Sequence, residues 1–317
     1  MSLNKKALVL FLCLCMLTAV LCGCANQAKQ DDGKIHIITT LFPYYDFARN
    51  VAGDLADVSL LLPPGMESHS YEPTPKDMIS IQACDLFVFT GGESDTWADE
   101  ILGSMEMHAA SLRVIDTVEA VQEELTDGMQ AERGSDEDAE EAEYDEHVWT
   151  SPRNAALIAL AIADALAKVD PDHADEYRQN ARVYSQQLFD LNDKFSHFFD
   201  ECSGMPLIFG DRFPFRYFAE EYGLECYAAF PGCSSQTEPS AATMAYLINK
   251  VRSTGCKTVF YIEFSNHLVA DSIAEATGVE TAMFHSCHNV SRTELDGGVS
   301  YISLMEQNLE TLKGAFD

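Results

Sequence analysis

A repeated unit of buried strand, loop and capped helix limits the fold of this chain more than any other feature. In residues 58–77 an apolar run predicts a strand that ends at Leu62, and Thr74 followed by Pro75 predicts the start of a helix. Strands that alternate with helices form parallel sheets covered on both faces. We therefore predict an α/β fold with two α/β halves. The other strands are predicted at residues 35–41, 86–90, 113–116, 207–209, 225–229, 258–264 and 281–284.

A long helical pattern over residues 172–202 separates the two halves. Large apolar side chains recur on one side of it at helical spacing, and we predict that they are buried in the core. The helix would join an N-terminal α/β lobe, residues 34–171, to a C-terminal α/β lobe, residues 203–317. The apolar side chains are those of Leu188, Leu191, Phe195, Phe198 and Phe199.

Acidic residues dominate the charge of the chain, with 51 Asp and Glu against 20 Lys and Arg. This balance argues against binding to nucleic acid or to an anionic membrane surface, and it suits a protein that meets cations. Residues 119–146 are rich in Asp and Glu, with Arg133 as their single basic residue. Their composition predicts a disordered acidic loop. Two interpretations stay open: a solvated loop without a role, and a loose collector of divalent cations near a site entrance.

The first residues have the features of a targeting segment. Two lysines precede the apolar residues 7–21, a stretch too short to predict a membrane-spanning helix. It ends in the letters LCGC, which resemble the lipobox of bacterial lipoproteins. The resemblance implies a signal peptide of residues 1–23, lipidation of Cys24 and a tether over residues 24–33. The mature protein would then be lipid-anchored at the extracytoplasmic face of the bacterial cell membrane, with a simple signal peptide or anchor as the alternative.

The cysteines beyond this segment do not form a recognisable metal-binding pattern. None of them belongs to a CxxC pair, so a zinc site of the knuckle type is not predicted. Export would permit disulfides, but the sequence assigns no pairing, and free buried thiols are equally open. The six are Cys84, Cys202, Cys226, Cys233, Cys256 and Cys287.

Residue types that bind metals lie at the ends of predicted strands or just before predicted helices. His69 lies in the loop after Leu62, and His147 comes just before a helix that Ser151 and Pro152 begin. Loops at the carboxyl ends of parallel strands line the ligand crevice of such folds. Imidazoles with one or two carboxylates suit zinc, or manganese where carboxylates are more numerous. The second half offers Asp211, Glu263, His285 and His288.

Several motifs resemble those of the zinc and manganese family of ABC-transporter solute-binding proteins. The motifs are PPGMESHSYEPTPKD, DEHVWTSP and FGDRFPFRYFAEEYGL, and the C-terminal helix GVSYISLMEQNLETLKGAF is similar as well. The resemblance covers essentially the whole mature chain. It implies two α/β lobes joined by one long rigid helix, with a metal bound in the cleft between the lobes.

The resemblance also implies a set of metal ligands. His69 and His147 match the two metal-binding histidines of the family's first lobe. The family's third histidine falls on Arg212, which stays protonated and does not bind metals. We therefore expect Asp211, beside it, to replace that ligand, although another residue of this lobe is an open alternative.

The family's last ligand is a carboxylate that follows the final strand. The corresponding neighbourhood here contains two histidines, and we expect His285 to take the role, with His288 as the alternative. Glu263 is a further candidate, either as a ligand or as a partner that orients one.

The function that the resemblance implies is metal capture and delivery, without enzymatic activity. The protein would bind a divalent ion, Zn²⁺ first and Mn²⁺ as the alternative, as a lipid-anchored monomer, and pass it to the permease and ATPase of an ABC importer. An exported zinc hydrolase is a second hypothesis, but the chain has no HExxH motif, and Glu263 is the only base that the sequence nominates. A surface adhesin or metal buffer without a transport role is a third.

Overall fold

The computed structural model describes residues 33–104, 109–123, 128–129, 144–202, 204–234, 236 and 238–316 of the 317-residue chain. The predicted signal peptide, Cys24 and most of the predicted acidic loop lie outside these residues. The chain divides into two units, residues 1–34 and 35–317, and the second is described below. No helix within the described ranges has the length and apolar character needed to cross a membrane.

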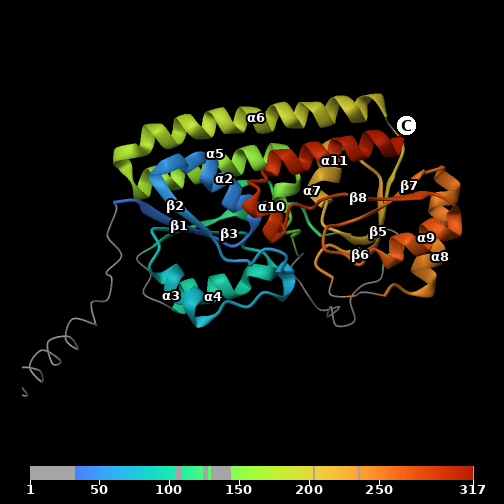
Figure 1. Cartoon of the computed structure of the whole chain (residues 1–317), viewed down its shortest axis with the longest axis horizontal. Coiled ribbons are helices and arrows are strands. Elements are labelled where there is room, and N and C mark those ends of the chain that lie inside the picture. The colour runs from blue at the N-terminus through green and yellow to red at the C-terminus, as the bar shows by residue number, and fades with distance from the viewer. Residues whose placement is uncertain are drawn as a thin grey trace, which may run out of the picture. The chain divides into compact units, whose positions relative to one another are not determined.

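The first half of this unit is a four-stranded parallel sheet with helices on both faces (Figure 1). Its elements are β1 (Ile35–Thr39), α2 (Phe42–Ala52), β2 (Ala56–Leu60), α3 (Pro75–Gln82), β3 (Leu86–Phe89), α4 (Thr96–Ser104), β4 (Ala110–Arg113) and α5 (Pro152–Val169). The strand order is β2-β1-β3-β4. Alternate residues of β1 face opposite sides, so that Ile37 packs with α2 and α5 whereas Ile38 packs with α3 and α4.

The second half repeats the same topology. Its sheet is also parallel, and its order β6-β5-β7-β8 again places the first strand between the second and the third. The prediction of two α/β halves with parallel sheets is therefore confirmed. Its elements are β5 (Leu207–Phe213), α7 (Arg216–Tyr222), β6 (Cys226–Pro231), α8 (Ala241–Thr254), β7 (Thr258–Tyr261), α9 (Leu268–Thr277), β8 (Glu280–Met283), α10 (Arg292–Asp296) and α11 (Tyr301–Phe316).

A helix of 28 residues, α6 (Ala174–Glu201), connects the two halves and extends over both of them (Figure 1). It packs on α5 in the first half and on α7 and α11 in the second. The row of apolar side chains predicted from the sequence, from Leu188 to Phe199, is buried in a core cluster to which both halves contribute. Burial of this row stabilises the position of the helix, because most of its exposed surface is polar.

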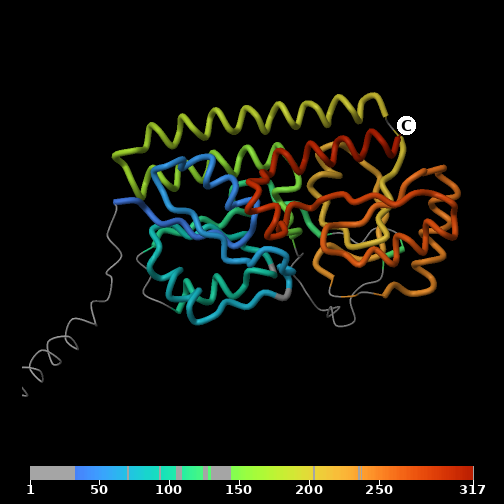
Figure 2. Tube along the Cα trace, viewed as in Figure 1, coloured from blue at the N-terminus to red at the C-terminus, as the bar shows by residue number. Residues whose placement is uncertain are grey.

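The chain that follows β8 returns to the first half (Figure 2). The backbone N–H of Phe42, at the start of α2, donates to the carbonyl of His288 at 3.2 Å. The side chain of Asn289 donates to the carbonyls of Pro63 and Met66 at 2.8 and 2.9 Å. These bonds place the segment of residues 284–291 against the loop between β2 and α3.

The predicted strand at residues 113–116 is wrong, because the strand lies earlier, at Ala110–Arg113. The apolar pair that suggested it, Val114 and Ile115, is buried in a 3-10 turn, η4 (Val114–Thr117). The strand itself is at the edge of the sheet and is largely exposed, so it needs no apolar run.

The strand predicted at residues 207–209 continues to Phe213, and Asp211 therefore lies within a strand instead of after it. The register against β6 shifts between Phe209 and Arg212. Gly210 lies at this irregularity, where a Cβ atom would come 2.4 Å from the Cα of Ala270 in α9. Only glycine permits this approach of helix to strand, and the helix in turn fixes the backbone on which Asp211 is carried.

Candidate metal centre

His69 lies in a short 3-10 turn, η2 (Ser68–Ser70), within the loop from β2 to α3. A capping box at the start of α3 fixes the far end of this loop. The Nδ1 atom of His69 lies 2.8 Å from the Oγ atom of Ser94, in the turn after β3, and 3.3 Å from the Oε1 atom of Glu146. Two loops from the carboxyl edge of the first sheet thus position this ring.

His147 is fully buried at the start of the turn η5 (Val148–Thr150). Its Nδ1 atom lies 3.0 Å from the Oδ1 atom of Asp145, which also accepts the backbone N–H of His147 at 2.8 Å. An acidic partner at Nδ1 places the ring proton there and leaves the Nε2 lone pair free. No group in the described part of the chain hydrogen-bonds to this buried Nε2 atom. Such an orphaned acceptor is rare inside proteins and points to a ligand.

His288 contacts both of these histidines. Its ring centroid lies 5.3 Å from that of His69 and 4.8 Å from that of His147. Behind it, the Ser286 hydroxyl donates to Glu263, and the Nδ1 atom of His288 lies 3.3 Å from the Ser286 oxygen. Because the hydroxyl proton is directed to Glu263, the serine oxygen is an acceptor for Nδ1–H. The chain of hydrogen bonds from Glu263 through Ser286 therefore orients the His288 ring.

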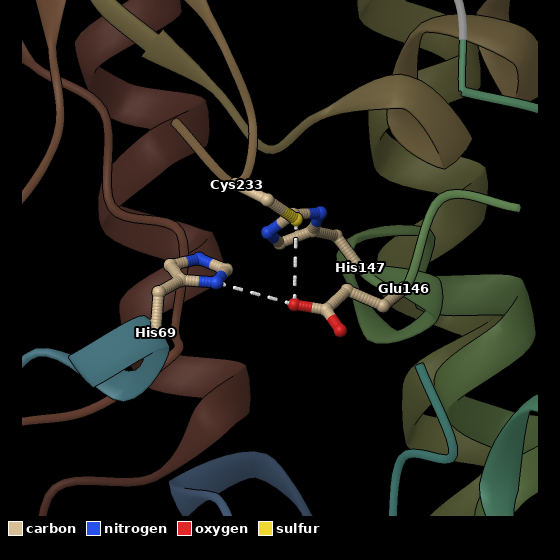
Figure 3. Close-up of side chains that lie close together, drawn as sticks. All are labelled: His69, Glu146, His147 and Cys233. Carbon is tan, nitrogen blue, oxygen red and sulfur yellow. Dashed lines mark hydrogen bonds and ion pairs between the residues drawn. The ribbon is translucent and has the colours of Figure 1, made fainter. Parts of the chain in front are cut away.

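A cysteine of the second half lies against this group. One potential ligand atom from each of His69, Glu146, His147 and Cys233 falls within 4.8 Å of the other three (Figure 3). The thiol of Cys233 lies 3.4 Å from the Oε1 atom of Glu146. Ser94 donates its hydroxyl to Glu146 and also its backbone N–H, the latter at 3.0 Å. The carboxylate of Glu146 is thus held at the centre of the cluster.

The surroundings of the histidines shift their pKa values in different directions. Burial lowers the pKa of His69, although the carboxylate of Glu146 opposes it. Burial and the neighbouring His147 and His69 rings hold the pKa of His288 well below its usual range. Burial also disfavours the charge on His147, but Asp145 outweighs burial and raises its pKa. His69 and His288 are therefore neutral at pH 7, as metal binding by imidazole requires.

Asp211 and Arg212 lie near the cluster but are occupied by other partners. Both line a cavity of about 390 Å³ whose wall also includes His69. The two oxygens of Asp211 accept backbone N–H groups, from Ile262 at 3.2 Å and from Arg212 at 2.8 Å. Arg212 donates to Glu67 at 2.7 Å. The hydrogen bonds of Asp211 favour a role in holding the strands, whereas its predicted role as a metal ligand stays a prediction.

The structure brings His288 against His69 and His147, and it directs His285 elsewhere. The Nδ1 atom of His285 accepts the backbone N–H of Cys287 at 2.9 Å, and it lies 3.6 Å from the Oε1 atom of Glu263. Glu263 in turn accepts the backbone N–H of Ser286 at 2.7 Å. These contacts favour His288 over His285 as a ligand and favour Glu263 as a partner that orients His288, whereas the predicted role of His285 stays a prediction.

Two residues of the cluster were missed from the sequence. Glu146 was counted with the acidic loop, although it is buried. Cys233 is a free thiol, which is one of the two alternatives that the sequence leaves open, but the sequence does not nominate it as a ligand. One signal for it was available: a cysteine that follows a predicted strand, in a lobe where Arg212 occupies the expected histidine position.

Comparisons with known proteins show which family the chain belongs to. A family model described as "Zinc-uptake complex component A periplasmic" matches residues 37–315. The high-affinity zinc uptake system protein ZnuA of Bacillus subtilis is 33% identical over 312 residues, covering 94% of this chain and 94% of that protein. The zinc-binding lipoprotein AdcA of Streptococcus pneumoniae is 32% identical over 99% of this chain, which spans 61% of the length of AdcA.

A solved structure shares the fold. The Zn(II)-bound ZnuA-like domain of Streptococcus pneumoniae AdcA superposes with a TM-score of 0.73 at 30% identity, covering 90% of this chain and 100% of that domain. The family match extends over most of the chain and includes both parallel sheets and the long helix between them. The chain belongs to the zinc-uptake complex component A family of solute-binding proteins.

Proposed function

We propose that this protein captures a zinc ion outside the cytoplasmic membrane and delivers it to an ABC importer. Membership of the family supports the proposal, as do relatives that are named for zinc uptake and zinc binding. The zinc ion is the cargo in this proposal and is not altered by any chemical step. A resemblance of residues 1–24 to a lipoprotein leader supports attachment through Cys24, with the importer's permease and ATPase as partners.

The observation that carries the proposal is the buried Nε2 atom of His147, which has no hydrogen-bond partner among the residues that the structure describes. The carboxylate of Asp145 lies at Nδ1, so that in the neutral ring Nε2 is the acceptor that a metal ion would use. His69 and His288 lie in contact with the same ring, and both are neutral because of their burial. We propose these three histidines as zinc ligands, because zinc prefers nitrogen and sulfur donors in a four-coordinate site.

The donor set also favours zinc over manganese. Manganese binds oxygen-rich sites, whereas the carboxylate of Glu146 is the single oxygen ligand in the cluster of His69, Glu146, His147 and Cys233. Binding without catalysis is proposed because Glu263, the base nominated from the sequence, is occupied by Ser286. A hydrolase needs a free base beside an open metal position.

The proposal is tested with metal-free protein and a competing chelator of known zinc affinity. His69→Ala and His147→Ala should each weaken zinc binding by about 100-fold or more, since loss of an outer-shell partner alone costs about 10- to 100-fold. His197→Ala is the matched control, because His197 is an exposed histidine on α6. Unchanged affinity in both site variants, or displacement of zinc by a modest excess of Mn²⁺, would overturn the proposal.

A further inference from the structure

We propose that Cys233 provides a thiolate ligand from the second half, completing a four-coordinate zinc site with the three histidines proposed above, His69, His147 and His288. The inference rests on the proposed zinc binding and specifies how the second half contributes to it. As the zinc–sulfur bond forms, the thiol releases its proton to solvent, and no redox change is involved.

The position of Cys233 is set by the backbone around it. The residue lies two positions after the end of β6, at the carboxyl edge of the second sheet. Gly232 precedes it, and a Cβ atom there would lie 2.8 Å from the Cε1 atom of His147. A side chain at this position would push the loop away from the histidine ring, so glycine permits the close approach that brings the thiol to the cluster.

The chemistry of the neighbours gives an independent indication of a ligand. The Nε2 atom of His147 is buried and has no hydrogen-bond partner within the described residues. A potential ligand atom of His147 and the Cys233 sulfur are both among the four that lie within 4.8 Å of one another. A zinc ion between them would satisfy the nitrogen lone pair and the thiolate at once, and both belong to the donor types that zinc prefers.

The other thiols of the mature chain have different surroundings. Cys84 and Cys256 each donate to a backbone carbonyl at 3.1 Å, and Cys287 is fully buried beside the carbonyl of His285. Cys202 lies at the end of α6, and Cys226 is buried at the start of β6. Within the described ranges, Cys233 is the one thiol that meets a carboxylate and two histidines.

The second half also needs a substitute ligand. Arg212 occupies the position at which the family motif has a histidine, and its guanidinium pairs with Glu67. Asp211, beside it, gives both oxygens to backbone N–H groups. Cys233 reaches the cluster from a neighbouring strand of the same sheet, because β6 pairs with the strand that carries Arg212. The thiol therefore replaces the missing imidazole from a different strand.

Cobalt substitution tests the inference directly. Metal-free protein is titrated with Co²⁺, whose bond to a thiolate gives a near-ultraviolet charge-transfer band that imidazole ligands do not give. The wild-type protein should show this band, and Cys233→Ser should lose it while zinc affinity falls by about 10-fold or more. Cys202→Ser is the control and should keep both the band and the affinity. Circular dichroism of the metal-free variants checks that they are folded.

A second measurement does not depend on any variant. Iodoacetamide should alkylate Cys233 in the metal-free wild-type protein and much less in the zinc-loaded protein, while alkylation of Cys202 should be the same in both. Cobalt binding without the thiolate band, with normal zinc affinity in Cys233→Ser, would overturn the role of Cys233 and leave the proposed function intact. Failure of the wild-type protein to bind zinc or cobalt would overturn both.

Discussion

Arg212 and Glu67 form an ion pair in which the Nη2 atom lies 2.7 Å from the Oε2 atom. The pair joins β5 of the second half to the loop of the first half that carries His69. Burial alone would raise the pKa of Glu67, but the guanidinium outweighs it and lowers that pKa. The arginine that occupies the position of an expected ligand therefore links the two sides of the site through an ion pair.

Loss of the ion pair between Arg212 and Glu67 should speed zinc release. Arg212→Met keeps the apolar stem and removes the charge, and we expect a dissociation rate about 3- to 10-fold higher, a modest effect because the pair is partly exposed. Stopped-flow mixing of zinc-loaded protein with excess chelator measures the rate. Arg292→Met removes a comparable but fully peripheral pair with Asp296 and should change nothing. Equal dissociation rates for wild type and Arg212→Met would contradict the role of this ion pair in retaining zinc.

The two histidines after β8 should respond differently to substitution. His288→Ala should weaken zinc binding by about 10-fold or more, because the His288 ring contacts both His69 and His147. His285→Ala should leave zinc affinity nearly unchanged and should lower stability, since the His285 ring accepts a backbone N–H in a buried turn. Chelator competition and thermal unfolding of both variants separate the two effects. The opposite order of affinities would restore His285 as the ligand.

Stability should depend on pH through Asp95. This carboxyl is buried and accepts the backbone N–H of Thr90, and burial raises its pKa to about 6. A raised pKa means that the folded state holds a proton that the unfolded state has released, so this contribution to the free energy of unfolding decreases as pH rises from about 4 to about 6. The decrease amounts to about 2 to 3 kcal/mol for a shift of about two units.

Asp95→Asn should remove this dependence. Its amide oxygen can still accept from Thr90, and the variant carries no charge to bury. Urea unfolding of metal-free protein between pH 4 and pH 7.5 should show the variant gaining stability relative to wild type as pH rises. A difference between the two proteins that stays constant over this range would show that Asp95 does not titrate as described.

The long helix should be sensitive on its buried side only. Phe195→Ala should lower the free energy of unfolding by about 3 to 5 kcal/mol, because the ring is fully buried and contacts Phe218 and Tyr222. Val183→Ala is the control on the same helix, since Val183 is 52% exposed, and it should change stability by less than about 0.5 kcal/mol. Similar losses for both variants would contradict the core role of the apolar row.

Sequence patterns were sufficient for the architecture. The row from Leu188 to Phe199 predicted α6 because burial of one helix face requires that spacing. The buried strands were visible as apolar runs, whereas the edge strand β4 was misplaced because an exposed strand carries no such run. A local sequence pattern therefore predicts buried strands more reliably than exposed edge strands, which are only hydrogen-bonded to a neighbouring strand.

Only half of the candidate site could be predicted from the sequence. His69 and His147 lie within motifs whose turns and caps are local, so their placement follows from nearby residues. The choice between His285 and His288 depends on bonds such as that of Phe42 to the His288 carbonyl, across more than two hundred residues. Cys233 depends on Gly232 approaching His147 from another sheet. Such long-range contacts produce no periodic pattern in the sequence.

The return of the chain after β8 restricts how this protein can open. The two halves are joined by α6, by the ion pair of Arg212 with Glu67, and by the segment in which Asn289 donates to the carbonyls of Pro63 and Met66. Because these links lie at separate places, we expect no single hinge about which the halves could swing wide apart. We therefore expect exchange of the ion to require displacement of the short loops that carry His69 and Cys233. Its rate should then depend on the local stability of those loops, and so on the residues that hold them in place.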